Sequence, residues 1–143
     1  MTAVEHALVE PLGAAESRAL LMTAELGRLA FTDAHGPTVE PFAFALEDAS
    51  IVIGVGARSG ARAAVGQTVA FEVDEIDPVR RTGWSVVAVG TLHRAPATVL
   101  AQPERWPDPA GETEPALLLL GVDRLTGRRL RRVPTRPPRR DPR

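Results

Sequence analysis

The stretch VAFEVDEIDPVRRTGWSVV, residues 69–87, decides the fold. Its first half alternates apolar with acidic residues, the pattern of a strand that buries one face. The apolar set is Val69, Phe71 and Val73, and the acidic set is Glu72 and Asp74. GWSVVAVGTLHR (83–94) is too uniformly apolar to be half exposed and predicts a central strand. The stretch therefore predicts an antiparallel hairpin with a solvated acidic turn, after which Trp84 returns the chain to the core.

Upstream of this hairpin the sequence predicts one helix and a three-stranded meander. GAAESRALLMTAEL (13–26) gathers apolar residues near one helical face, and Gly27 follows as a stop signal. Short turns then join RLAFTD (28–33), TVEPFAFAL (38–46) and IVIGV (51–55), which predict strands. Pro41 cannot donate a ladder hydrogen bond, so we expect an edge or a bulge at that point.

The remaining segments predict a short helix and two more strands. ARSGARAAV (57–65) suggests a turn with a short helix, ALLLLGVD (116–123) a buried strand, and RRLRRV (128–133) a final edge strand. Six or seven short strands at regular spacing, with few helices, predict a mainly β protein built as a small barrel.

Length and composition restrict the class of protein. At 143 residues the chain suggests a single domain, which we place at 1–133, followed by a basic, disordered tail at 134–143. No apolar run is long enough to cross a bilayer, and the start lacks the order of a secretory signal, so we expect a cytoplasmic protein without a membrane partner. The absence of cysteine excludes disulfides and thiol nucleophiles.

Charge is distributed unevenly along the chain. Residues 1–123 carry 17 acidic residues against eight arginines, whereas residues 124–143 carry nine arginines and one aspartate. Every cation is an arginine, which can bind phosphate or carboxylate in a bidentate manner. Because no aromatic residues are interleaved with these arginines, the tail favours solubilisation over nucleic-acid recognition.

The glycine-rich stretch IVIGVGARSGARAAV (51–65) has two functional interpretations besides that of a solvated loop. Its spacing resembles a dinucleotide fingerprint, but too few residues separate the flanking strands for a crossover helix. Alternatively, exposed backbone N–H groups together with Arg58, Ser59 and Arg62 could converge on a phosphate.

Other candidate groups have weaker patterns. The acidic residues of the hairpin could bind a divalent cation, but their alternation favours a solvated turn that pairs with Arg80 and Arg81. The three histidines show no metal-ligand spacing, although His93 at a strand end could ligate haem. The aromatic residues Phe42, Trp84 and Trp106 are candidates either for the core or for stacking on a planar ligand.

Four segments together resemble a known family. They are GRLAF (27–31), PTVEPFAFAL (37–46), VAFEVDEIDPVRRTGWSVVAVGTLHR (69–94) and LTGRRL (125–130). In colinear order over residues 8–132 they resemble the actinobacterial pyridoxamine 5′-phosphate oxidase-like proteins, the flavin-binding split-barrel family. The resemblance implies a six-stranded split β-barrel and a homodimer with FMN, or in relatives the deazaflavin F420, in a groove between the subunits.

The sequence departs from that family at its polar anchors. Where members carry an Arg-Thr pair this chain has Gly54 and Val55, and where they carry P-V-N-F it has Ala43 in place of the amide. Losing one charged phosphate contact costs about 1.5–3 kcal/mol, or about ten- to a hundredfold in affinity. Only Arg58 or Arg62 stands near the family's usual lysine.

Two functional hypotheses follow from the resemblance. In the first, the chain is a flavin-dependent oxidoreductase acting on a small-molecule substrate. Arg58, Ser59 and Arg62 then hold the FMN phosphate, and three aromatic residues line the ring and substrate cavity. Those aromatic residues are Phe42, Trp84 and Trp106. In the second, the barrel has lost its flavin and binds another small molecule or serves as an assembly module.

Overall fold

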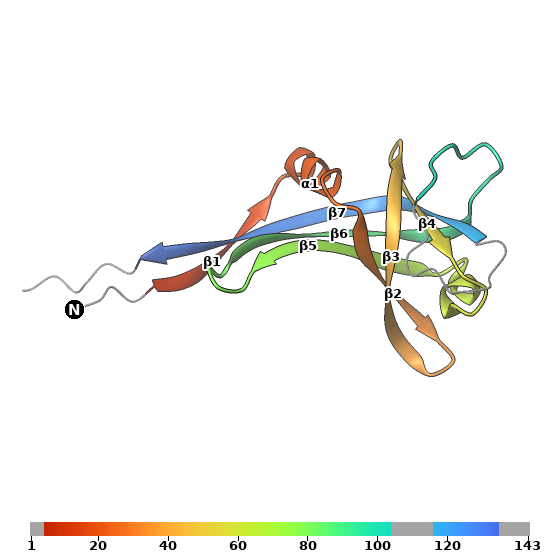
Figure 1. Ribbon diagram of the computed structural model, residues 1–143, viewed down its shortest axis with the longest axis horizontal. Coiled ribbons are helices and arrows are strands. Elements are labelled where there is room, and N and C mark those ends of the chain that lie inside the picture. Colours follow the sequence, from red (N-terminus) through yellow and green to blue (C-terminus); the bar gives the residue numbers. More distant parts are fainter. Residues whose placement is uncertain (1–4, 104–115, 135–143) are drawn as a thin grey trace, which may run out of the picture.

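The computed structural model describes residues 5–103 and 116–134 and shows a mainly β protein (Figure 1). The elements follow in the order β1 (Glu5–Leu12), α1 (Ala14–Leu21), β2 (Leu26–Asp33), β3 (Gly36–Glu47), β4 (Ser50–Val55), the 3₁₀ helix η1 (Gly60–Ala64), β5 (Thr68–Asp77), β6 (Thr82–Arg94) and β7 (Ala116–Pro134). Nearly every connection is short, and neighbouring strands are antiparallel. The predicted fold class is confirmed.

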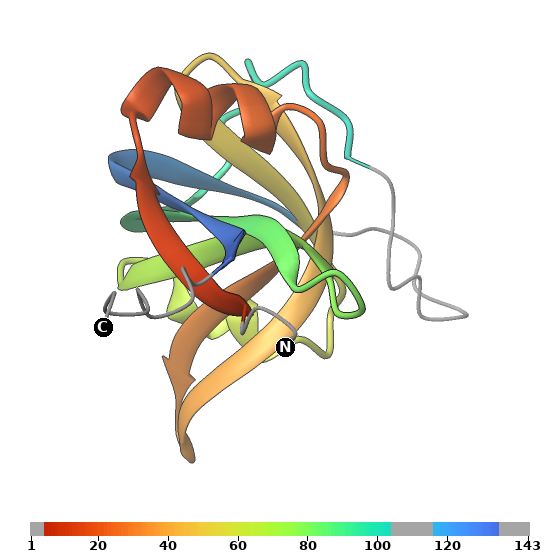
Figure 2. The ribbon, with the colours of Figure 1, turned by 90° about the vertical axis from the view of Figure 1, so that its left-hand side faces the viewer.

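Six strands close into the barrel. The order β7-β4-β3-β2-β5-β6 returns to β7 through the pairing of β6 with β7. The first strand, β1, lies outside this ring and pairs only with the far half of β7, from Gly127 to Pro134. Figure 2 shows α1 on one side of the sheet that β1, β7, β6 and β5 form.

The β5–β6 hairpin forms as its alternation predicts. Val69, Phe71 and Val73 are buried, and on β6 the inward residues from Trp84 to Leu92 alternate with half-exposed ones. At the turn, the Asp77 carboxylate accepts the backbone N–H groups of residues 79 and 80. Apolar burial on one face and a polar turn together hold the register of this hairpin.

Three details differ from the sequence prediction. The sequence does not predict strand β1, because apolar and polar residues do not alternate regularly in it. Its partner is the distant end of the chain, in β7. The segments predicted as separate strands at 116–123 and 128–133 are one strand, β7. Gly127 does not break it: a Cβ there would meet the Ser17 hydroxyl, so the glycine admits the close approach of α1.

The helix also ends earlier than predicted. It stops at Leu21, and Gly27 belongs to β2, where the ring of Phe71 occupies the space that a side chain would need. Pro41 pairs with Arg28 on β2, but β4 pairs with β3 only from Phe44 to Glu47. Pro41 therefore has no partner strand on its other side, as its missing N–H requires.

Candidate functional site

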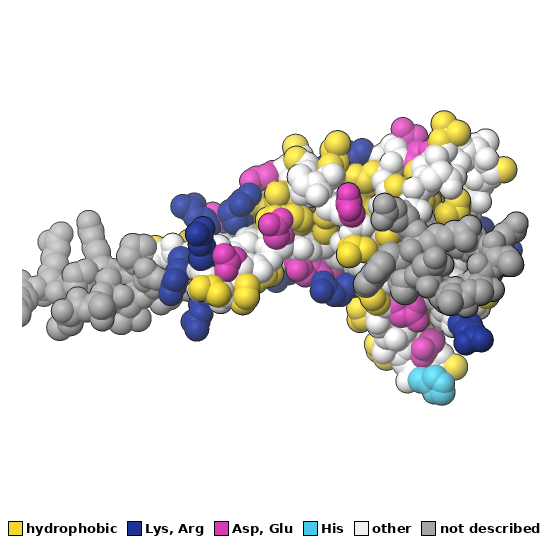
Figure 3. Space-filling model, in the orientation of Figure 1, with side chains coloured by type: hydrophobic (Ala, Val, Ile, Leu, Met, Phe, Trp, Pro, Cys, Tyr) yellow, Lys and Arg dark blue, Asp and Glu magenta, His cyan; other side chains and the backbone are white. Residues whose placement is uncertain are grey.

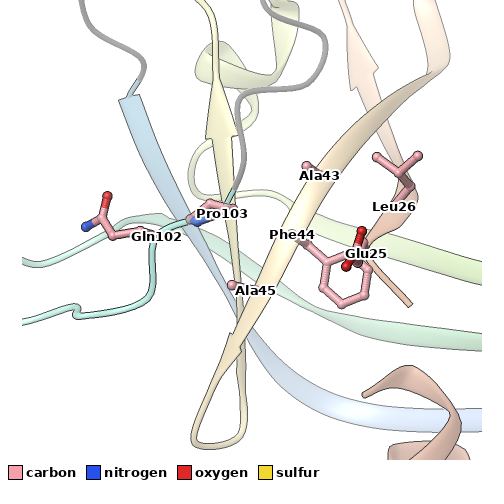
Figure 4. A pocket seen from close by; sticks show the side chains of 7 residues that line it. All are labelled: Glu25, Leu26, Ala43, Phe44, Ala45, Gln102 and Pro103. Carbon is pink, nitrogen blue, oxygen red and sulfur yellow. The ribbon is translucent and has the colours of Figure 1, made fainter. Parts of the chain in front are cut away.

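A hollow of about 280 Å³ opens on β3, beside the start of β2 (Figure 4). Its lining comes from three segments of the chain. They supply Glu25 and Leu26 before and in β2, Ala43, Phe44 and Ala45 on β3, and Gln102 and Pro103 from the segment after β6. The wall is mostly apolar with one carboxylate and one amide, a composition suited to a small organic ligand.

Two small residues lie beside the hollow. Strands β3 and β4 pair as far as Phe44 with Ile53, and Ala43 and Gly54 are the next positions on the two strands. A Cβ on Gly54 would have a single near neighbour, Pro103, at 4.0 Å. Ala43 and Gly54, two of the positions where the sequence departs from the family pattern, are therefore adjacent in the structure.

A second hollow of about 370 Å³ adjoins the first, since Phe44 and Ala45 line both. It lies between α1 and the β3–β4 turn, and its other lining residues include Met22. Arg18 and Asp48 also line this hollow, and the Arg18 guanidinium donates to the backbone carbonyl of Asp48 at 2.5 Å. Together the two hollows form a groove along β3, from Ala43 to Asp48.

The glycine-rich loop between β4 and β5 brings Arg58, Ser59 and Arg62 together but uses them differently. Arg62 donates from Nε to the Gly56 carbonyl at 3.0 Å and from Nη2 to the Val55 carbonyl at 3.2 Å. These bonds fix the loop. In the described part of the chain, the exposed Arg58 makes no hydrogen bond or ion pair and is the guanidinium free to bind a ligand.

The Ser59 hydroxyl has a structural role in this loop. It donates to the Glu40 carboxylate at 2.6 Å and accepts the Ala61 N–H at 3.1 Å, so it caps η1. Glu40 lies on β3, three residues before Ala43, and so joins the loop to the strand that carries the hollow. A phosphate at this point would meet a carboxylate as well as Arg58.

The other candidate residues are placed as follows. Phe42 and Trp84 are 3% and 7% exposed and pack in the hydrophobic core. Trp106 lies outside the described residues, and His93 is exposed at the end of β6. The dinucleotide interpretation of the glycine-rich stretch is wrong: β4 and β5 are not neighbours, and η1 joins them without a crossover helix.

Sequence reasoning missed a charged cluster on β2 and β5. Nη1 of Arg28 lies 3.1 Å from the Asp74 carboxylate and 3.5 Å from that of Glu72. Burial, followed by the neighbouring Asp74, raises the pKa of Glu72 to about 7, although Arg28 opposes the shift. A hollow of about 190 Å³ lies beside Arg28 and Asp74. Only the strand register, which pairs Arg28 with Glu72, brings these residues together.

Two classes of site are not found in the described residues. Across 5–103 and 116–134, no three acidic or histidine side chains gather as a metal site would require. Within the same ranges no helix has both the length and the apolar character to span a bilayer.

Comparison with known proteins identifies the family. The family model for pyridoxamine 5′-phosphate oxidase matches residues 13–129. The chain belongs to this family. The match includes the groove along β3 and all of the six-stranded barrel except the last five residues of β7.

One known protein resembles this chain in sequence, and two solved structures resemble it in fold. The uncharacterised protein Rv0080 of Mycobacterium tuberculosis is 37% identical over 98 residues, which is 63% of this chain and 60% of that protein. An FAD-binding protein of Mycobacterium smegmatis superposes with a TM-score of 0.66 at 24% identity, covering 87% of this chain and 100% of that one. An FAD-binding protein of Mesorhizobium loti gives 0.69 at 24% identity, covering 88% and 99%. At such identity the two structures establish the split-barrel fold.

Proposed function

We propose that this chain is a flavoprotein oxidoreductase that binds FMN in a groove between two copies and acts on a small-molecule substrate. The proposal rests on the two hollows on β3 and on the exposed Arg58 in the loop that follows β4, in a chain that matches the family model for pyridoxamine 5′-phosphate oxidase. Two structural relatives described as FAD-binding proteins support a flavin as the class of cofactor. The flavin would supply the hydride chemistry, and the protein would supply orientation and electrostatics.

In this proposal Arg58 binds the phosphate directly, while Ser59 and Arg62 hold the loop that presents it. Arg58 can turn toward the phosphate without breaking an existing contact, whereas Arg62 would first have to release two carbonyls. The planar ring would lie against Ala43 and Ala45, whose small side chains form part of the wall of the first hollow. Phe42 and Trp84 would support that wall from within the core, and Trp106, which lies outside the described residues, stays a predicted lining residue of the cavity.

FMN is preferred among the flavins because one exposed guanidinium suits one terminal phosphate. The deazaflavin F420 is the alternative cofactor, and FAD is a second alternative because two structural relatives are described as FAD-binding proteins. A phosphate next to Arg58 gains a charge-assisted hydrogen bond, which the nearby Glu40 carboxylate partly offsets.

A second candidate function follows from the contacts of the loop itself. Ser59 is bound to Glu40, and Arg62 is bound to two backbone carbonyls, so two of the three proposed phosphate ligands already have partners. The groove, in contrast, is apolar and open. The alternative is therefore a split barrel without flavin that binds an uncharged small molecule along β3 or serves as an assembly module.

The visible absorption spectrum of the purified protein separates the two functions. The flavin proposal predicts a flavin band, either as isolated or after incubation with FMN and removal of the excess. F420 and FAD, tested in parallel, would identify a different flavin by the band that is retained. A protein that stays colourless after all three incubations, yet is well folded by circular dichroism, would contradict the flavin proposal and support the second function.

A further inference from the structure

The segment 95–103, which follows β6, forms one wall of the first hollow. Its last two residues, Gln102 and Pro103, line that hollow, and Figure 4 shows both on the side of β3 away from Leu26. Pro103 also lies next to Gly54 on β4, 4.0 Å from the position that a Cβ would take there. The width of the hollow therefore depends on where this segment lies.

Little apolar burial holds the segment 95–103 in place. Each of its residues is exposed or half-buried, and Leu100, its largest apolar side chain, is 84% exposed. The segment contains no charged residue, so its side chains form no ion pair. A segment that buries so little surface opens locally at a small cost in free energy unless hydrogen bonds hold it.

Glu47, the last residue of β3, supplies such bonds. One oxygen of its carboxylate, Oε1, accepts the Leu100 N–H at 2.6 Å and the Ala101 N–H at 3.0 Å. Glu47 forms no ion pair within the described ranges, and Figure 3 shows arginines gathered at the opposite end of the molecule, where β1 and β7 run side by side. Hydrogen bonds to an ionised acceptor are about twice as strong as those between neutral groups, so these two can fix the segment.

The other hydrogen bonds of the segment do not fix its second half. At its start the Ala95 N–H donates to the Leu117 carbonyl on β7 at 2.9 Å, and the Val99 N–H donates to the Pro96 carbonyl within the segment at 3.1 Å. Among the residues that the structure describes, 96–103 make no other hydrogen bond to the barrel than the two that Glu47 accepts. Beyond Ala95, Glu47 is therefore the group that binds the segment to the barrel.

The turn that carries Glu47 is itself fixed on two sides. Glu47 pairs with Ser50 across the β3–β4 turn, and Ser50 pairs with Gly121 on β7. On the other side the Arg18 guanidinium donates to the Asp48 carbonyl, which joins the turn to α1. Glu47 therefore reaches the segment from a well-supported turn, so the position of the turn determines that of the segment.

We propose that Glu47 is a positioning residue of the groove: its carboxylate holds the segment 95–103 beside β3, and a ligand binds tightly in the first hollow when that wall is in place. The inference rests on the proposed function and deepens it, because it names the residue that regulates the width of the same site. Since one carboxylate binds two consecutive N–H groups, a small carboxylate from solution can replace it when the Glu47 side chain is removed.

Hydrogen exchange in the full chain tests the position of the segment. In Glu47→Ala the amides of Leu100 and Ala101 should exchange at least about tenfold faster by NMR, while the thermal midpoint stays close to that of the wild type because the segment buries little surface. Acetate should restore the protection, and sodium chloride at the same concentration should not. Glu47→Gln should be intermediate, since its amide oxygen is a neutral acceptor.

Ligand titrations test whether the wall matters for binding. The probes are FMN and N-phenyl-1-naphthylamine, an uncharged fluorescent molecule that binds apolar hollows without needing a phosphate site. For Glu47→Ala we expect the dissociation constants to rise about three- to tenfold and to recover in acetate. Recovery in acetate separates positioning from a general loss of structure, because acetate replaces only the missing carboxylate.

Asp77→Ala is the matched control. The Asp77 carboxylate also accepts two consecutive backbone N–H groups, those of Val79 and Arg80, each at 3.0 Å, but in the β5–β6 turn. The variant should speed exchange of those two amides and leave both dissociation constants within about twofold of wild type. An equal loss of affinity in Asp77→Ala and Glu47→Ala would overturn the proposal.

The remaining outcomes keep this inference separate from the flavin proposal. Unchanged exchange at Leu100 and Ala101 in Glu47→Ala, or unchanged affinity for a probe that the wild type binds, would overturn the role of Glu47 and leave the flavin proposal standing if FMN is bound. A wild type that binds the uncharged probe but not FMN, with an affinity that depends on Glu47, would overturn the flavin proposal alone. A wild type that binds neither probe would overturn both.

Discussion

The inner faces of β5 and β6 and the loop of residues 56–62 hold their conformations by different means. The inner faces are stabilised by apolar burial: Phe71 is fully buried and meets the Phe44 ring edge-on at a centroid distance of 5.2 Å. The loop is held by polar bonds, chiefly from Arg62 to two carbonyls and from Ser59 to Glu40. The barrel is therefore expected to tolerate changes in the loop, where the proposed cofactor contacts lie, far better than changes in the core.

The largest effect is expected in the core. Phe71→Ala removes a fully buried ring and leaves a cavity between β2 and β5, which should lower the free energy of unfolding by about 3–5 kcal/mol. Urea unfolding followed by circular dichroism measures this change. A loss below about 1 kcal/mol would contradict the account of the core.

A smaller loss is expected at the bulge between β6 and β7. A Cβ on Gly90 would collide with the backbone carbonyl of Gly121, so Gly90→Ala should force the two strands apart. The expected cost is about 1–3 kcal/mol, as for other overpacked sites. The matched control is Gly121→Ala, since a Cβ there would meet no atom within 4 Å. Equal stability of the two variants would show that the bulge relaxes freely.

The two arginines of the loop should contribute differently to the stability of the fold. Arg62→Ala removes two side-chain hydrogen bonds to backbone carbonyls and should cost about 1–3 kcal/mol of stability. Arg58→Ala breaks no bond within the described chain and should leave the unfolding midpoint unchanged. Thermal unfolding of both variants side by side measures the difference. If Arg58→Ala were the less stable, the assigned roles would be reversed.

A further effect concerns pH. In a single subunit the pKa of Glu72 is raised from 4.5 to about 7, so between these values the folded chain holds a proton that the unfolded chain has lost. This stabilising contribution is complete below pH 4.5 and is lost as pH rises through 7. For dilute, monomeric protein we expect a falling unfolding free energy over that window, and Glu72→Gln should flatten it. An unchanged slope in the variant would mean that another group titrates there.

The alternation of apolar and polar residues along the strands is sufficient to predict the hairpin and the barrel class, because burial of every second residue is a local property of the chain. It could not predict β1, whose partner lies over a hundred residues away, or the continuity of β7, where Gly127 makes room for a helix. The candidate site was predicted less completely for a related reason. That Ala43 and Gly54 are neighbours depends on strand register. Sequence spacing also cannot distinguish Arg62, bound to carbonyls, from the exposed Arg58.

The central claim is that a flavin phosphate binds at Arg58 beside the groove along β3. Its most direct measurement is the equilibrium titration of FMN fluorescence with wild type, Arg58→Ala and Arg80→Ala, the last removing an exposed arginine in the turn between β5 and β6. We expect Arg58→Ala to raise the dissociation constant about ten- to a hundredfold and Arg80→Ala to leave it within about twofold of wild type. Equal affinity of wild type and Arg58→Ala for FMN would contradict the claim.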